Sequence, residues 1–392
     1  MKRKGNYREN VFAILTLTVL TTMLGCSASY VGNDIATVPE TVIRSVQAGD
    51  VDIDVSVDPR AELMSIIFRL AGNKEYNACR IRKYDKDIKK YFKPYKGHSA
   101  IKFAATLRNK RGMGYNAPMS LAVHVGEVPN LQELVLLDPR PAELDTRWQP
   151  EEAREFLEEA RLFAKDSNFG RFYNYHKPMY DKAVSDLTQL LENQAHFEWF
   201  EDFFGQKAKP HLNVVLGMAN GSNSYAASVV IKGKKHIYSV LGVWRCDLFG
   251  FGNPKFHRGS VGTIHHELCH SYSNPIVFKY SDELRAAGQR MYPQLANKMR
   301  SRAYGNWQNM MCEYVVRVCT IQYYKRYETT NTVERDIKDN INSRGFIGMR
   351  ELNEAVSKYE DEREKYPTFE SFFPRVIEFF DEYSKKFTSD EG

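Results

Sequence analysis

The segment from Thr263 to His270 contains the pattern His-Glu-x-x-His, with two histidines four residues apart. On an α-helix, positions i and i+4 lie on one face about one turn apart, so both imidazoles can reach a single ion. Zinc binds neutral imidazole well, and a catalytic zinc site uses three protein ligands and leaves one position open for water. Glu267 falls beside that open position, where a carboxylate can accept a proton from the water. The spacing therefore predicts two zinc ligands, His266 and His270, and a general base, Glu267.

The surroundings of this pattern favour a buried helix. Between positions 262 and 274 the only charged residue is Glu267. Polar side chains in a buried helix are costly unless they are paired or bind a metal ion. The alternative is a helix whose histidines are hydrogen-bonded core residues. His265 points about 100° away from His266 around a helix, so we expect it to be a neighbour of the site and not a ligand.

The third ligand must be a carboxylate, because no histidine follows His270. Two glutamates compete for this role. Glu283 lies in a predicted helix N-terminus, where the helix dipole already favours an acidic residue. Glu313 is the only acidic residue in an apolar predicted helix, and Arg317, one turn later, can pair with it. One interpretation is that Glu313 and Arg317 form only an ion pair within the helix. We favour the other, in which Glu313 binds zinc and Arg317 holds its carboxylate or aids the substrate.

Zinc hydrolases commonly use a second electrophile to stabilise the developing oxyanion. The sequence offers four candidates for this role, which it does not rank. They are Tyr225, Tyr272, His257 and Arg317. We select Tyr225 and Arg317, together with Glu267, as the predicted catalytic residues.

The first 25 residues predict export. Four basic residues precede an apolar run from Val11 to Leu24, which is shorter than the roughly 20 residues that a membrane span needs. This layout is typical of a secretory signal peptide. Met23 to Cys26 resembles the bacterial lipobox, in which cleavage before the cysteine leaves it as the lipid-modified N-terminus. An ordinary signal peptide cut near Ala28, or a short anchor helix, is the alternative. We expect a cell-envelope protein held in the outer membrane by a lipid on Cys26, on its periplasmic or its surface side.

Composition excludes other classes. The predicted signal peptide carries four basic residues and one acidic residue, so it accounts for +3 of the formal net charge of +6. The basic run from Arg80 to Lys96 is interrupted by Tyr and Asp and is typical of a solvated helix face, so nothing indicates nucleic-acid binding. Besides Cys26 the chain has five cysteines without paired C-x-x-C motifs, which argues against a disulfide scaffold or a sulfur-based zinc site.

The elements that must position these residues can be predicted from periodicity. Alternation from Val51 to Val57 predicts a strand, followed by a helix from Asp58-Pro59 onward. Three- and four-residue apolar steps predict helices over 150–165, 180–192 and 194–204. Strand patterns then cover 211–218, 225–231 and 236–244, directly before the histidine motif.

We therefore predict an α+β fold, in which a small antiparallel sheet and the His-Glu-x-x-His helix form a zincin-like core within a mainly helical chain. The expected parts are a signal peptide (1–25), a tether (26–50), a mainly helical part (51–205) and a catalytic part (206–392), with 51–390 as one continuous domain the alternative. In zincin metallopeptidases an edge strand lines the cleft, and such an edge can pair with an extended peptide.

Four segments together resemble a known family. They are 58–63, 223–225, 266–275 and 313–317, which carry Asp-Pro-Arg-Ala-Glu-Leu, Asn-Ser-Tyr, the histidine motif through Asn-Pro, and Glu-x-x-x-Arg. The chain is similar over about residues 50–385 to an uncharacterised domain-of-unknown-function family of exported, gluzincin-like lipoproteins of Bacteroidetes type. The resemblance implies His266, His270 and Glu313 as zinc ligands and Glu267 as the base; it implies no substrate.

The function that we predict is peptide-bond hydrolysis by a lipid-anchored zinc metallopeptidase with one zinc ion. Its partners would be a peptide or protein substrate and, through Cys26, the membrane. The alternative is a non-catalytic envelope lipoprotein that binds a peptide or glycan in the same cleft. Metal content and peptide cleavage distinguish the two.

Overall fold

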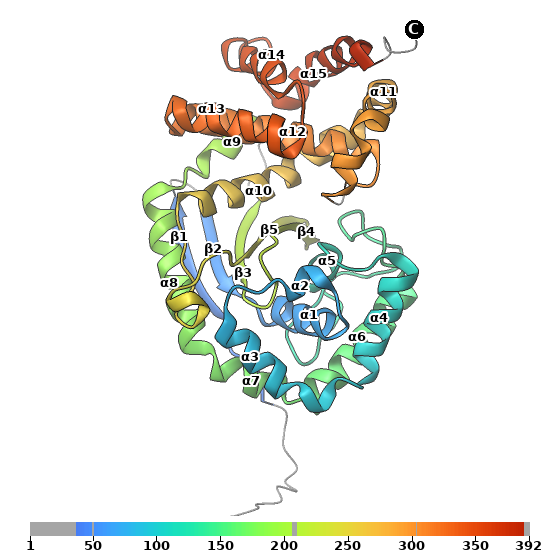
Figure 1. The fold of residues 1–392 in the computed structure, drawn as a ribbon, viewed down its shortest axis with the longest axis vertical. Helices are drawn as coiled ribbons and strands as arrows, with labels where there is room; N and C mark the ends of the chain where they lie inside the picture. Colours follow the sequence, from blue (N-terminus) through green and yellow to red (C-terminus); the bar gives the residue numbers. More distant parts are fainter. Residues whose placement is uncertain (1–36, 49–50, 206–209, 303, 388–392) are drawn as a thin grey trace, which may run out of the picture. The chain divides into compact units, whose positions relative to one another are not determined.

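Apolar alternation in three separate regions of the chain builds one five-stranded sheet. The computed structural model describes residues 37–48, 51–205, 210–302 and 304–387. The strands are β1 (Val42–Ala48), β2 (Val51–Val57), β3 (His211–Gly217), β4 (Tyr225–Ile231) and β5 (Lys234–Gly242). Their order across the sheet is β1-β2-β3-β5-β4, so β4 forms one edge (Figure 1).

The sheet is mixed, which corrects the antiparallel sheet expected from the sequence. β1 pairs with β2 and β4 with β5 in antiparallel register, whereas β2 and β3, and β3 and β5, are parallel. Parallel pairing of β2 with β3 is possible because the chain between them is long enough for a crossover through helices. The two predicted parts, 51–205 and 206–392, therefore share one sheet.

Fifteen α-helices are present among the described residues. They are α1 (Pro59–Leu70), α2 (Lys74–Asn77), α3 (Arg82–Tyr91), α4 (Ser99–Arg111), α5 (Ala117–Val123), α6 (Pro150–Asp166), α7 (Phe169–Tyr175), α8 (Lys177–Gln194), α9 (Glu198–Phe204), α10 (Arg258–Lys279), α11 (Ser281–Arg300), α12 (Trp307–Tyr327), α13 (Thr330–Lys338), α14 (Met349–Asp361) and α15 (Phe369–Ser384). The helices and strands expected from periodicity lie close to these bounds, and the α+β class is confirmed.

Two long helices pack on the sheet and contact each other. α8 packs against β1 and β2, while α10 packs against β5 and β4. α10 also packs along α12, and α12 contacts α11, α13 and α14, so that α12 forms the centre of a helical layer beyond α10 (Figure 1). The histidine helix thus lies between the sheet and this layer, with partners on both sides.

The predicted tether is wrong for part of its length. Residues 42–48 form β1, and Val42 and Val46 are buried. Before it, the backbone nitrogen atoms of Thr37 and Glu40 donate to side chains of α7. The predicted signal peptide and Cys26 lie outside the described residues. No helix in the described ranges is long and apolar enough to cross a bilayer.

Candidate metal centre

α10 begins at a well-formed cap and presents the two predicted histidines on one face. The N-cap is His257, whose Nδ1 accepts from the backbone of Gly259, while Ser260 completes a capping box. His266 and His270 follow two turns later, with ring centroids 5.1 Å apart and ring planes at 89°. Their side chains are 18 % and 16 % exposed, so both imidazoles are reachable from one side.

α12 brings Glu313 to these imidazoles. The Nε2 atom of His270 lies 3.2 Å from Oε1 of Glu313, and Nε2 of His266 lies 3.7 Å from Oε2. One donor atom from each of the three residues lies within 4.8 Å of the others, a spacing that fits a shared ion. These three residues therefore form a possible metal-binding triad.

Close contact between the two helices makes this approach possible. A Cβ atom at Gly262, one turn before His266, would collide with the hydroxyl group of Tyr324 on α12. Glycine removes that clash, so the backbone of α10 can lie against the Tyr324 side chain. The distance between the helices, and with it the distance from the histidines to Glu313, depends on this position.

Glu313 is held by a buried arginine. Arg317 donates through Nη2 to Oε2 of Glu313 at 2.9 Å and to the Tyr304 hydroxyl at 3.1 Å, and its Nη1 donates to Oδ1 of Asn340 at 3.1 Å. Burial alone would raise the pKa of Glu313, but Arg317 and His270 bring it well below its usual range. The carboxylate is therefore ionised and fixed, as a metal ligand must be.

The two imidazoles differ in their environment. Nδ1 of His270 lies 3.4 Å from Oδ1 of Asn274, and donation in this direction leaves Nε2 free to bind a cation. Burial opposes protonation of His270, but the contact with Glu313 raises its pKa. Burial lowers the pKa of His266 strongly, and Arg317 adds to this effect. His266 is therefore the neutral donor of the pair.

Glu267 and Tyr225 lie near one another beside the triad. Burial raises the pKa of Glu267 to about 7, although His270 pulls it down. Tyr225, the first residue of the edge strand β4, has a buried hydroxyl with no hydrogen-bond partner among the described residues. Burial raises the pKa of Tyr225, and the charges of Glu75, Tyr115 and Glu267 raise it further. The hydroxyl is thus a neutral donor within electrostatic reach of Glu267.

The structure separates the remaining candidates from the triad. Glu283 is exposed on α11 and is not among the grouped metal-binding residues. Tyr272 packs against Phe200 and Phe204 with ring centroids about 5 Å apart, and His257 caps α10. His265 is fully buried, and its ring stacks on Tyr323 at 3.9 Å, which agrees with the prediction that it is a neighbour.

Tyr304 and Asn340 are residues of this site that sequence reasoning missed. Tyr304 lies between α11 and α12, and burial together with Glu313 raises its pKa to about 12. Asn340 lies in a π-helical turn, Asp339–Arg344, and is 2 % exposed. No spacing rule connects either residue to Glu313. The only usable signal was Arg317 itself, because a buried guanidinium needs more acceptors than one carboxylate provides.

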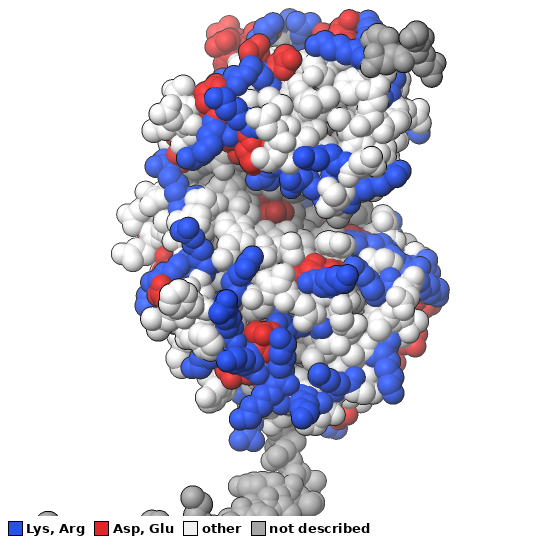
Figure 2. Space-filling view, in the orientation of Figure 1, with Lys and Arg blue, Asp and Glu red and all other residues white. Residues whose placement is uncertain are grey.

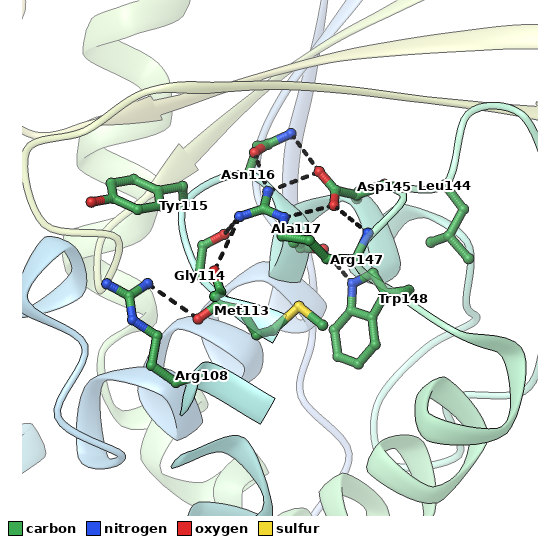
Figure 3. Close-up of polar contacts among 12 residues, drawn as sticks. Arg108, Met113, Gly114, Tyr115, Asn116, Ala117, Leu144, Asp145, Arg147 and Trp148 are labelled. Atoms are coloured by element: carbon green, nitrogen blue, oxygen red, sulfur yellow. Dashed lines mark hydrogen bonds and ion pairs between the residues drawn. The ribbon is translucent and has the colours of Figure 1, made fainter. Parts of the chain in front are cut away.

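The surface above the site is hollowed. Figure 2 shows a hollow between the part that carries α11 to α15 and the part that carries the sheet, with acidic atoms inside it. The loop between α4 and α5, residues 112–116, lies within electrostatic reach of Tyr225. Arg147 fixes that loop by donating to the carbonyl groups of Gly112 and Gly114 and to the side chains of Asn116 and Asp145. Figure 3 shows the contacts with Gly114, Asn116 and Asp145. The same loop carries Tyr115, whose charge raises the pKa of Tyr225.

Comparison with known proteins gives a family but no activity. No curated protein and no solved structure matches the chain. A family model described as a domain of unknown function (DUF4932) matches residues 53–379. This range contains β3, β4, β5, most of β2 and all three residues of the triad. The chain therefore belongs to the DUF4932 family of domains of unknown function.

Proposed function

We propose that this chain is a zinc-dependent peptidase, held at the cell envelope by a lipid on Cys26. The observation that supports this most is the triad of His266, His270 and Glu313 beside a half-buried Glu267. Two imidazoles and one carboxylate are the donor set of catalytic zinc sites that keep one position open. When bound there, zinc would supply Lewis acidity and lower the pKa of a water molecule.

The chain's own residues divide the remaining work. The Glu267 carboxylate accepts the proton of the attacking water and returns it to the amine of the leaving product. Its raised pKa suits this exchange, because a base with a pKa near the working pH takes and returns a proton with similar ease. The unpaired hydroxyl of Tyr225 is available to donate to the developing oxyanion. Arg317 keeps Glu313 oriented and does not itself reach the reacting atoms in this proposal.

A peptide is the substrate class that the fold favours. β4 is an edge strand that contacts α10, and it begins at Tyr225. An extended peptide can add to such an edge through main-chain hydrogen bonds, which would carry its backbone past the triad. A zincin-like core, with the edge strand and the histidine helix on the two sides of the cleft, is part of this proposal.

Replacing Glu267 with Gln tests the proposal. The variant should retain bound zinc, because Glu267 is not a ligand, but lose about 10²–10⁴-fold in turnover, the usual contribution of a general base. Metal content is measured by mass spectrometry, and cleavage is measured on a random peptide library. Glu283→Gln, an exposed acid on the next helix, is the matched control and should behave as the wild type. Equal cleavage by both variants, or metal-loaded wild type that cleaves no peptide, contradicts the proposal and favours a binding lipoprotein.

Replacing Tyr225 with Phe tests the second electrophile. The ring packing is retained, so folding and zinc content should not change, whereas turnover should fall by about 10²-fold or more, as for the loss of one oxyanion donor. The decrease should appear in kcat more than in KM, because the interaction forms in the transition state. An unchanged kcat would exclude Tyr225 from this role.

A further inference from the structure

An exposed apolar loop precedes α10 and is not used by the proposed reaction. Leu248, Phe249 and Phe251, called the apolar tip below, are 73 %, 91 % and 44 % exposed. Phe249 is more exposed than any other large hydrophobic residue that the structure describes. Exposure of three large apolar side chains within four residues is costly in water, so the tip needs a partner.

The backbone holds the tip in this conformation. Leu248 and Phe249 have φ angles of 48° and 57°, a left-handed conformation that is unfavourable for bulky residues. Hydrogen bonds between Asp247 and Asn253 and between Arg245 and Lys255 close the loop beneath them. Strain of this kind persists only where the surrounding structure imposes it. The loop is therefore built to present these side chains.

The tip rests on a basic helix face. A Cβ at Gly250 would lie 2.7 Å from the carbonyl oxygen of Arg80, just before α3, and the ammonium group of Lys86 lies 4.7 Å from the centre of the Phe251 ring. The exposed face of α3 consists of five cations, called the basic face below. They are Arg82, Lys83, Lys86, Lys89 and Lys90.

The acidic groups around the tip and the basic face already have partners. Asp247 pairs with Lys255 at 3.0 Å, and Asp85 pairs with Arg69 and Lys89. Asp87 faces His176 across α7. Within the described residues no ion pair is formed by Arg82, Lys83, Lys86 or Lys90. The surface beside the tip is thus strongly positive, and Figure 2 shows Lys and Arg gathered over the end where Figure 1 places α3 and α7.

The start of the described chain lies at this same end. Thr37 and Glu40 hydrogen-bond to Asn168 and Asn174 of the α7 region, and the Tyr91 hydroxyl of α3 donates to the carbonyl oxygen of Asn168. Ten residues lie between Cys26 and Thr37, so eleven Cα–Cα steps join them. An extended chain of that length spans at most about 40 Å, so a lipid on Cys26 would keep α3 near the bilayer.

We propose that the apolar tip and the basic face of α3 together bind an anionic membrane surface. The cations approach the lipid phosphates while Leu248 and Phe249 enter the boundary between headgroups and acyl chains. A lipid chain on a tether leaves the orientation of the protein free, whereas this second contact fixes which side faces the bilayer. The proposal rests on the lipid anchor of the proposed function, but it does not depend on catalysis by the triad.

The test is hydrogen–deuterium exchange of the full chain on vesicles of phosphatidylcholine with and without phosphatidylglycerol. Amides of residues 246–256 should exchange more slowly only on the anionic vesicles. Loss of each basic residue near an anionic surface changes partitioning about fivefold, so Lys83→Glu with Lys90→Glu should lower the bound-to-free ratio of the loop by at least about 25-fold, because each glutamate also adds a charge that the surface repels. These two lysines are chosen because Lys86, which contacts Phe251, is left in place.

Variants of the apolar tip, with matched controls elsewhere on the surface, test whether the tip itself contacts the membrane. Leu248→Asn with Phe249→Asn should abolish the protection, and folding is preserved because asparagine tolerates left-handed backbone. Leu136→Ser, at the same 73 % exposure, and Lys232→Glu with Lys234→Glu should leave the protection unchanged. Equal exchange with and without vesicles, equal protection on both lipids, or protection that requires an added protein overturns the proposal.

Discussion

Two arginine–carboxylate clusters of this molecule have similar components and different capacities. In the first, Arg147 binds both oxygens of Asp145, an amide oxygen and two carbonyl groups, and Asn116 donates to the same aspartate (Figure 3). Its acceptors and donors satisfy one another. In the second, Arg317 contacts only one oxygen of Glu313, and both carboxylate oxygens lie near imidazole nitrogens.

The difference shows what separates a structural ion pair from a metal centre. Arg147 lowers the pKa of Asp145, against the opposing effect of burial, and the carboxylate also accepts from the Asn116 amide and the Arg147 backbone, so its acceptors are occupied by donors. Glu313 has the same kind of partner, but it also faces two nitrogen atoms that both carry lone pairs when neutral. Without a cation those lone pairs and the carboxylate repel, unless a proton is shared. The ability of a cluster to bind a cation therefore depends on which of its acceptor atoms have no donor, and not on the presence of a buried ion pair.

Removing the third ligand should have the largest effect on zinc binding. Glu313→Gln keeps the side-chain volume but removes the charge, so zinc affinity should fall by roughly 10²–10³-fold, because one of four ligands accounts for about a quarter of the roughly 10–16 kcal/mol found for structural zinc sites. Isothermal titration with zinc measures this change. Asp145→Asn, the matched change in the other cluster, should leave zinc affinity unaltered. Unchanged affinity in Glu313→Gln would remove Glu313 from the coordination shell.

A third buried carboxyl group has no guanidinium contact among the described residues. Its effect on the stability of the fold should therefore depend on pH. Glu62 is fully buried and accepts from the Tyr84 hydroxyl and the backbone of Ala219. Burial raises the pKa of Glu62 from 4.5 to about 7, although Tyr84 lowers it. Because the folded state holds the proton more tightly, this group stabilises the fold below pH 4.5, and the contribution is lost as pH rises to about 7.

Glu62→Gln should remove that dependence. Between pH 4.5 and 7 the free energy of unfolding of the wild type should fall by roughly 3 kcal/mol relative to that of the variant, an order-of-magnitude value for a pKa shift of this size. Denaturant unfolding at several pH values measures it. A constant difference across this range would mean that Glu62 is ionised in the fold.

Replacing the two arginines with Met should affect different properties of the protein. Arg317→Met should lower zinc affinity about 10–100-fold, the usual effect of losing a group that orients a ligand. Arg147→Met should not change zinc affinity, but it should lower the free energy of unfolding by roughly 2 kcal/mol, less than for a fully buried pair because a quarter of its side chain is exposed. Zinc titration and denaturant unfolding of both variants check this pattern. Equal effects of the two variants on zinc affinity would contradict the distinction between the clusters.

Local patterns predicted most of the elements and the three grouped residues. The His-Glu-x-x-His spacing is encoded within one helix, and an isolated glutamate in an apolar helix signals that a partner is needed. Distant contacts were not predictable in this way. The parallel pairing of β2 with β3 joins residues more than 150 positions apart, and Tyr304 and Asn340 reach Arg317 only through the packing of α11 and the π-helical turn against α12.

β1 was missed for a different reason. Arg44 stands between Val42 and Val46 on the same face of the strand, and Ile43 stands on the other face, so the alternation of apolar and polar residues is too irregular to indicate a strand by itself. β1 is stabilised by its pairing with β2 and by α8, which covers both strands. Tertiary context, and not local propensity, decides such edge strands.

The glycine at position 262 has a consequence for ion choice. The imidazoles move with one helix and the carboxylate with the other, so the gap between the helix axes determines the radius of the cation that all three donors can touch at once. Alanine at this position would push Tyr324 away and widen the gap. The preferred ion of this protein is thus set in part by a residue that has no side chain and never touches it.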